Sequence, residues 1–157
     1  KPFAALGAKV LAYSRHAQPE WEEAGIEAAE LDELLSRSDI VSLHVPLNDT
    51  TRGFMSAERI AKMKDGAILI NCARGPVVDN SALADALNSG KLSAAGIDVF
   101  DMEPPIPEDY PLLHAKNTLL TPHIAFATKE SMIRRAKIEF DNVSAYLQGK
   151  PENVCKF

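Results

Sequence analysis

The stretch Ala67-Ile-Leu-Ile-Asn-Cys-Ala-Arg74 decides the fold, because a short apolar run, typical of a buried strand, leads there to a lone arginine. Two further polar residues, Glu103 and His123, follow other short apolar runs in the same way. In a fold that alternates strands and helices, the carboxyl ends of the strands line one crevice in which ligands bind. An arginine, a carboxylate and a histidine in that crevice could hold a carboxylate substrate and move a proton. The sequence therefore indicates an enzyme.

Five short apolar runs are expected to form the strands of a parallel sheet. Several are continuous rather than alternating, which is typical of strands that are covered on both faces. The five runs are Val10–Tyr13, Ile40–Val45, Ala67–Asn71, Ala94–Phe100 and Thr118–Leu120. Helical patterns separate them, and this alternation predicts an α/β fold with a Rossmann-like, doubly wound parallel sheet and right-handed crossovers.

Two of the expected helices carry clear end signals. Asp79 is expected to cap the first of them, and Gly90 lies just past its end. Thr128 is expected to cap the last helix, which stops near Gly149. The last helix has a stripe of apolar residues on one face, namely Met132, Ala136, Phe140, Val143 and Leu147. This stripe is either part of the core or a dimer contact, and the pattern does not separate the two.

The first residues indicate a sheet that is truncated at its N-terminus. Lys1 to Leu6 resemble the end of a helix, with Gly7 as its C-cap. A dinucleotide-binding fold of this type would begin one strand earlier, with a glycine-rich turn that cradles the pyrophosphate at a helix N-terminus. The pattern G-x-G-x-x-G does not occur in the 157 residues. Either the chain is truncated or its function does not need that turn.

Composition excludes several classes of function. The net charge of −5 argues against a nucleic-acid partner, which would require a basic face. No apolar run approaches the roughly 20 residues of a membrane span, so no membrane partner is expected, and the first residues do not resemble a signal peptide. The two cysteines, Cys72 and Cys155, fit neither a disulfide framework nor a zinc site. We therefore expect no metal, and a cytoplasmic location.

Four motifs, taken in this order and spacing, resemble the cofactor-binding domain of the D-isomer-specific 2-hydroxyacid dehydrogenases. They are Ser38-Asp-Ile-Val-Ser-Leu-His-Val-Pro-Leu47 with Thr51 downstream, Ile70-Asn-Cys-Ala-Arg-Gly-Pro-Val-Val-Asp79, Gly96-Ile-Asp-Val-Phe-Asp-Met-Glu-Pro104 and Thr121-Pro-His-Ile-Ala125. The resemblance extends from Gly7 to Val154. Family members are about twice this length. The resemblance thus implies an NAD(P)-binding domain over residues 1–150 that is incomplete at its N-terminus, with residues 151–157 starting the connection to a missing substrate domain.

The resemblance also implies a reaction and three residues that perform it. A small 2-keto acid would be reduced by hydride from a nicotinamide; glyoxylate, hydroxypyruvate, pyruvate and 3-phosphohydroxypyruvate are all candidates. Arg74 would bind the substrate carboxylate and carbonyl, which suits its planar fork of donors. His123 would protonate the carbonyl oxygen during reduction. Glu103 would hold the imidazole and favour its charged form.

Cofactor contacts follow from the same resemblance. Val45 and Pro46 are implied to flank the adenosine. The backbone of Cys72 and Ala73 is implied to face the nicotinamide, and Asp98 to accept a hydrogen bond from its carboxamide. The family thus implies NAD or NADP as the cofactor, and a homodimer paired through this domain.

Thr51, which lies in the loop behind the residues that flank the adenosine, is implied to belong to the same cofactor site. The residues after the first expected strand concern the choice between the two cofactors. In members that use NAD, the second strand normally ends on an acidic residue that binds the ribose hydroxyls. Here Tyr13 is followed by Ser14 and Arg15, which suit a 2′-phosphate, so NAD and NADP both remain open.

Two other functions remain open beside the dehydrogenase. One is a dinucleotide-sensing binding protein, similar to the transcriptional corepressors that resemble this family and keep the arginine, glutamate and histidine. The other is an inactive fragment of the dehydrogenase, because the chain lacks the glycine-rich turn and the substrate domain that would hold the reactants. Holding reactants in position can be worth roughly 7–11 kcal/mol. Turnover of a keto acid would distinguish the enzyme from both.

Overall fold

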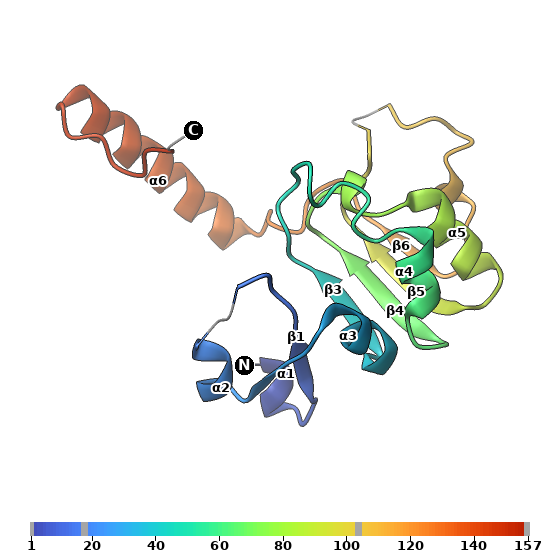
Figure 1. Cartoon of the computed structure of the whole chain (residues 1–157). Helices are drawn as coiled ribbons and strands as arrows, with labels where there is room; N and C mark the ends of the chain where they lie inside the picture. The colour runs from blue at the N-terminus through green and yellow to red at the C-terminus, as the bar shows by residue number, and fades with distance from the viewer. Residues whose placement is uncertain (1, 17–18, 103–104, 156–157) are drawn as a thin grey trace. The chain divides into compact units, whose positions relative to one another are not determined.

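The computed structural model describes residues 2–16, 19–102 and 105–155, which form two compact units. The first unit is Lys1–Pro122 and the second is His123–Phe157. Figure 1 shows the strands in the first unit and a long helix in the second, and each unit is described by itself. The expectation of a cofactor domain that extends to residue 150 stays a prediction.

The main sheet of the first unit has four parallel strands in the order β3-β4-β5-β6. Their bounds are β3 Ile40–Leu43, β4 Ala67–Asn71, β5 Leu92–Ile97 and β6 Thr118–Leu120. The helices of this region are α3 Leu31–Arg37, α4 Ala57–Lys62 and α5 Asn80–Asn88, and two 3-10 turns, Gly75–Val77 and Pro111–Leu113, lie in the connections. This is the predicted parallel α/β architecture.

A second, two-stranded parallel sheet is formed by β1 Val10–Ala12 and β2 Ile26–Ala28. Two short helices flank these strands, α1 Pro2–Ala5 and α2 Glu20–Glu23. In the usual doubly wound order, 3-2-1-4-5-6, a central strand separates the strands that correspond to β1 and β3. The described residues supply no strand at that position, which explains why the sheet is divided.

Several expected boundaries are corrected by the structure. Strand β2 was not expected, β1 ends at Ala12 and β3 ends at Leu43. Strand β5 runs over Leu92–Ile97 and therefore begins and ends earlier than the expected run. The expectation that the strands are covered on both faces fails for β3, whose residues alternate between exposed and buried.

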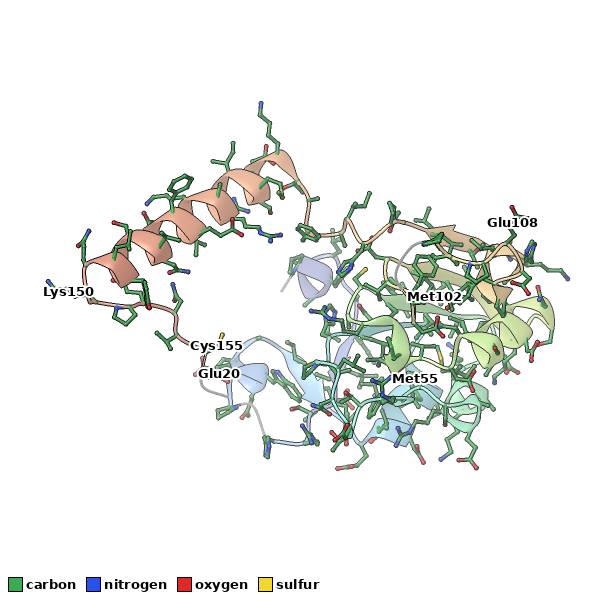
Figure 2. The ribbon with its side chains drawn as sticks, turned by 90° about the horizontal axis from the view of Figure 1, so that it is seen from above. Glu20, Met55, Met102, Glu108, Lys150 and Cys155 are labelled. Atoms are coloured by element: carbon green, nitrogen blue, oxygen red, sulfur yellow. The ribbon has the colours of Figure 1, made fainter. Side chains whose placement is uncertain are left out.

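One face of the main sheet carries the core. Its largest fully buried side chains include Leu35, Leu69, Leu83, Leu92, Ile97 and Met55, and Figure 2 labels Met55 among the packed side chains of this unit. Figure 1 shows α4 and α5 over this sheet. On the strands, Ile40 and Leu119 remain 56% and 70% exposed. The sheet that positions the polar residues at its strand ends is therefore packed against the core on one face.

The second unit is dominated by α6, Lys129–Leu147. The predicted cap is confirmed, because the Thr128 hydroxyl accepts a hydrogen bond from the Ser131 amide at 3.1 Å. Gly149, with a φ of +71°, lies just past the end of the helix. None of the α6 residues is buried, so the apolar stripe of the helix is not covered within the second unit itself. No helix in the described part of the chain is long and apolar enough to cross a membrane.

Candidate active site

The candidate site is built on loops that follow three neighbouring strands of the first unit. Arg74 lies in the loop after β4, Asp98 directly follows β5, and Thr121 directly follows β6. Because the strands are parallel and adjacent, their carboxyl ends meet at one edge of the sheet. The expected crevice edge thus brings together Arg74, Asp98 and their neighbours.

The amide of Asn71 shapes the loop that carries Arg74. Asn71 is completely buried at the end of β4. Its side-chain nitrogen donates to the carbonyl oxygen of Arg74, and its side-chain oxygen accepts from the Ala73 amide, both at 3.0 Å. Asparagine is favoured in such turns because its side chain substitutes for backbone hydrogen-bond partners. This role was not predicted from the sequence, although an asparagine directly after an apolar run was the available signal.

The loops after β4 and β5 pack directly on each other at Gly75. A Cβ on this glycine would lie 1.8 Å from the carbonyl carbon and oxygen of Phe100, and 2.3 Å from the Asp101 nitrogen. Only glycine permits so close an approach of two backbones. The position of the Arg74 loop is thereby set against the loop that follows Asp98.

Tyr110 holds the far end of the loop after β5. Its hydroxyl donates to the Asp101 carboxylate at 2.8 Å, and its ring packs edge-on against Phe100. Burial, together with the nearby Asp101 carboxylate, raises the pKa of Tyr110, so the hydroxyl keeps its proton as a donor. This bond fixes the backbone two residues before Glu103, which itself lies outside the described residues.

The side chain of Arg74 is exposed, and one of its terminal nitrogens donates to the Ala73 carbonyl oxygen at 2.6 Å. Among the described residues it has no carboxylate partner within ion-pair distance. A guanidinium offers five N–H donors in a planar fork, which matches a carboxylate. Arg74 is therefore able to receive an anionic ligand.

Asp98 is a buried carboxylate, 3% exposed, and the Thr121 hydroxyl donates to one of its oxygens at 2.5 Å. Its backbone amide donates to the Asn71 carbonyl oxygen, which ties β5 to β4. A buried carboxylate held in this way is a fixed hydrogen-bond acceptor and fits an amide group such as a carboxamide. This hydrogen bond from Thr121 was not predicted from the sequence, because Asp98 lies 23 residues away along the chain.

Cys72 lies on the loop between Asn71 and Ala73, and its side chain is exposed. Desolvation of the thiol by the protein atoms around it, and then the negative charge of Asp98, raise the pKa of Cys72. The thiolate is the nucleophilic form of cysteine. The environment therefore makes Cys72 a poor nucleophile and leaves its backbone as the part that can serve a ligand.

On the other side of the candidate site, Thr51 holds the loop that carries the residues expected to flank the adenosine. The buried hydroxyl of Thr51 donates to the Pro46 carbonyl oxygen at 2.6 Å and accepts from the Asn48 amide at 2.9 Å. Pro46 is exposed and Val45 is half-buried. The hydroxyl of Thr51 is thus engaged inside the loop, and the residue acts on a ligand through the position of Pro46.

A cavity of about 720 Å³ opens beside the carboxyl ends of β1 and β2. Ser14 lines it, together with Tyr13, His16 and Trp21. Arg15 follows at the same strand end. The volume lies within the range of about 300–1,000 Å³ that is typical of ligand pockets.

His123 is the first residue of the second unit and is described within it. It has a φ of +57°, and its ring meets the Phe126 ring edge-on at 6.1 Å between centroids. A non-glycine residue in the left-handed region is uncommon, and such residues cluster at functional sites. Among the described residues, no three His, Cys, Asp or Glu side chains are grouped so that they could hold a metal ion.

Comparison with known proteins identifies the family. A family model described as "D-isomer specific 2-hydroxyacid dehydrogenase, NAD binding domain" matches residues 1–125. A hydroxypyruvate reductase from Blautia hydrogenotrophica is 51% identical over 150 residues, which are 96% of this chain and 46% of that protein. A glyoxylate reductase from Aeropyrum pernix is 43% identical over 152 residues, and the matched region is 96% of this chain and 45% of that protein.

Solved structures of D-lactate dehydrogenases resemble this chain as well. A D-lactate dehydrogenase from Treponema pallidum superposes with a TM-score of 0.91 at 32% identity, and the match covers 99% of this chain and 51% of that one. A D-lactate dehydrogenase from Aquifex aeolicus, complexed with NAD and lactic acid, gives a TM-score of 0.86 at 38% identity, covering 94% and 48%. The chain thus spans about half the length of the relatives that it matches. It belongs to the D-isomer-specific 2-hydroxyacid dehydrogenase family.

Proposed function

We propose that the protein containing this chain transfers a hydride between a nicotinamide dinucleotide and a small D-2-hydroxy acid or 2-keto acid. The observation that carries the proposal is the direct packing of two loops, where Gly75, next to Arg74, lies against the backbone of Phe100 and Asp101. This packing supports a site in which an exposed cation and the buried Asp98 carboxylate lie on neighbouring loops. The family and the names of its members support the reaction class.

In the proposed reaction, Arg74 binds the carboxylate and carbonyl oxygens of the substrate. Its side chain is exposed and forms no ion pair with the described residues, so a substrate carboxylate need not displace a protein carboxylate. A charge-assisted, bidentate contact also fixes the orientation of the substrate. When bound, the reduced nicotinamide supplies the hydride that reaches the carbonyl carbon.

His123 donates the proton that the carbonyl oxygen takes up, so the C=O π bond is replaced by a new C–H bond and a new O–H bond. In the oxidation direction the same imidazole accepts the alcohol proton. Glu103 orients the imidazole and stabilises its charged form. General acid catalysis of this kind typically contributes about 10²–10⁴-fold to the rate.

The cofactor is held by residues of the first unit. Asp98 accepts a hydrogen bond from the carboxamide, and the backbone of Cys72 and Ala73 faces the nicotinamide. Val45 and Pro46 flank the adenosine, in a loop that Thr51 holds in place. The matched family description and the NAD-complexed relatives support NAD, while Ser14 and Arg15 keep NADP as an alternative.

The test is a panel of 2-keto acids assayed with NADH and with NADPH, using the protein that contains this chain. We expect turnover of glyoxylate or hydroxypyruvate, because relatives at 43–51% identity carry the names of reductases of these acids. Cofactor binding without turnover of any acid would contradict the enzyme and favour a dinucleotide-sensing protein. We also propose the homodimer that the family resemblance implies, and sedimentation velocity on the same sample tests it: a monomer would contradict this proposal.

A further inference from the structure

We propose that Tyr110 is a positioning residue for the substrate: it holds Phe100 and Asp101 against Gly75 and thereby fixes the loop that carries Arg74. The inference rests on the proposed function and deepens it, because it adds a residue that lies outside all four motifs of the family resemblance. Tyr110 does not touch the substrate in this arrangement, and it acts through the backbone of the two loops.

The two residues that lie against Gly75 are the same two residues that Tyr110 contacts. A Cβ on Gly75 would overlap the backbone of Phe100 and the backbone nitrogen of Asp101, so the loops after β4 and β5 are in direct backbone contact. The Tyr110 hydroxyl donates to the Asp101 carboxylate at 2.8 Å, and the Tyr110 ring meets the Phe100 ring edge-on with the centroids 5.8 Å apart. The loop after β5 is therefore held at one point by both Gly75 and Tyr110.

Tyr110 is itself anchored in the core of the first unit. It is 5% exposed and belongs to the hydrophobic core cluster. Its amide donates to the Pro107 carbonyl oxygen at 3.1 Å, and its carbonyl oxygen accepts from the Leu113 amide at 2.9 Å. The 3-10 turn that follows it, Pro111–Leu113, contacts α5 and contains the fully buried Leu112. Tyr110 thus ties Phe100 and Asp101 to a well-packed part of the fold.

The hydroxyl of Tyr110 provides a contact that a phenylalanine would lack. A hydrogen bond to a carboxylate is charge-assisted and is roughly twice as strong as one between neutral groups. Burial, together with the Asp101 carboxylate, raises the pKa of Tyr110, so the hydroxyl keeps its proton and stays a donor. Asp101 is exposed, and the last torsion of an aspartate side chain has broad preferences, so the hydrogen bond rather than packing selects its orientation. Loss of the hydroxyl is therefore expected to release Asp101 and to leave the ring against Phe100.

Release of Asp101 would affect substrate binding through Arg74, which directly precedes Gly75. A guanidinium binds a carboxylate through two parallel hydrogen bonds, so its direction matters as well as its distance. A shift of about 1 Å in a positioned group can cost about 10²-fold in rate. Asp98, the proposed cofactor contact on the same loop, is bonded separately by the Thr121 hydroxyl. We therefore expect weaker binding of the keto acid and a preserved affinity for the cofactor.

The experiment is a double-mutant cycle with Tyr110→Phe and Asp101→Ala in the protein that contains this chain, using KM and kcat for the reduction of glyoxylate and hydroxypyruvate. Each single variant is expected to raise KM by about fivefold, the factor that corresponds to one hydrogen bond of ordinary net strength, and to change kcat by less than about twofold. The double variant is expected to match the single variants, because both changes remove the same bond. The dissociation constant of the reduced cofactor is expected to change by less than about twofold in all three.

Two further variants test the assignment to this bond. Asp101→Asn is the conservative variant, since its side-chain oxygen remains an acceptor for the Tyr110 hydroxyl, and it should keep the KM of the unaltered protein. Asp109→Ala is the matched control, because it removes an exposed carboxylate next to Tyr110 on the same loop and should leave KM unchanged.

Several results would overturn the positioning role. An unchanged KM in Tyr110→Phe, with a lower free energy of unfolding in urea, would show that the bond stabilises the fold only. A fall in kcat at unchanged KM would place the effect on proton transfer instead of substrate binding. Effects that multiply in the double variant, or an equal rise of KM in Asp109→Ala, would also contradict the role. If the unaltered protein reduced no keto acid, the proposed function would fail and this inference with it, whereas the other results leave the proposed function standing.

Discussion

At the scale of single residues, the candidate site depends on side chains that hold backbone rather than on groups that react. Asn71 bonds the loop of Arg74 from within, and Gly75 allows that loop to lie against Phe100. Thr121 occupies one oxygen of the Asp98 carboxylate. The exposed Arg74 side chain therefore lies at an edge of the sheet where the Asn71 and Asp98 side chains are buried and hydrogen-bonded.

Gly75→Ala is expected to lower the free energy of unfolding by about 3 kcal/mol, the upper end of the usual cost of overpacking. The added Cβ would lie 1.8 Å from two backbone atoms of Phe100, so the two loops would have to separate. Gly96→Ala is the matched control, because its Cβ would meet Ile70 Cγ1 at an ordinary distance of 3.9 Å. Urea denaturation measures both losses, and equal losses would contradict the close approach at Gly75.

Asp98→Asn is expected to increase the alkylation rate of Cys72 at neutral pH, because the thiolate is the reactive form and its share rises when the pKa falls. Burial and the Asp98 charge raise the pKa of the Cys72 thiol, so removing the charge lowers that pKa. More thiolate is then present at any pH below the pKa. Mass spectrometry after iodoacetamide treatment measures the rate, with Cys155 as the internal control. An unchanged ratio of the two rates would argue against the coupling.

At the scale of elements, the sequence pattern predicts strands that form an apolar run, such as β4 and β6, better than a strand with no such run. The bounds of β4 and β6 are those expected, and the caps at Asp79 and Thr128 are confirmed. Strand β2 was missed because it has three residues with a glutamate in the middle, which leaves no apolar run. The expected end of β5 at Phe100 was too late, because Asp98 and Val99 already belong to the loop that packs on Gly75.

Asp79→Ala is expected to cost about 1 kcal/mol of stability, the typical effect of removing an N-cap. The Asp79 carboxylate accepts from the Ala82 amide at 3.0 Å and thereby satisfies a free donor of α5. Asp85→Ala makes the same chemical change at an exposed position inside α5, where alanine is the better helix former, so no loss is expected there. Thermal unfolding of the two variants compares them directly. A loss as large for Asp85→Ala would refute the capping role.

At the scale of the whole molecule, motif order along the chain predicted the family and the fold, whereas contacts between distant segments could not be predicted. The motifs around Arg74, Glu103 and His123 are local in sequence and could be recognised one by one. The bonds from Thr50 to Arg15 and from Thr121 to Asp98 join segments 35 and 23 residues apart. The division of the sheet likewise follows from which strands find partners in space.

We propose that His123 is the proton-transfer residue of a 2-keto acid reductase. The most direct measurement compares His123→Ala with the unaltered protein, using kcat for keto-acid reduction and the dissociation constant of the reduced cofactor. We predict that kcat falls by about 10²–10⁴-fold, the usual contribution of a general acid, while cofactor affinity changes by less than about twofold. Equal losses in kcat and cofactor affinity, or an unchanged kcat, would contradict the role of His123.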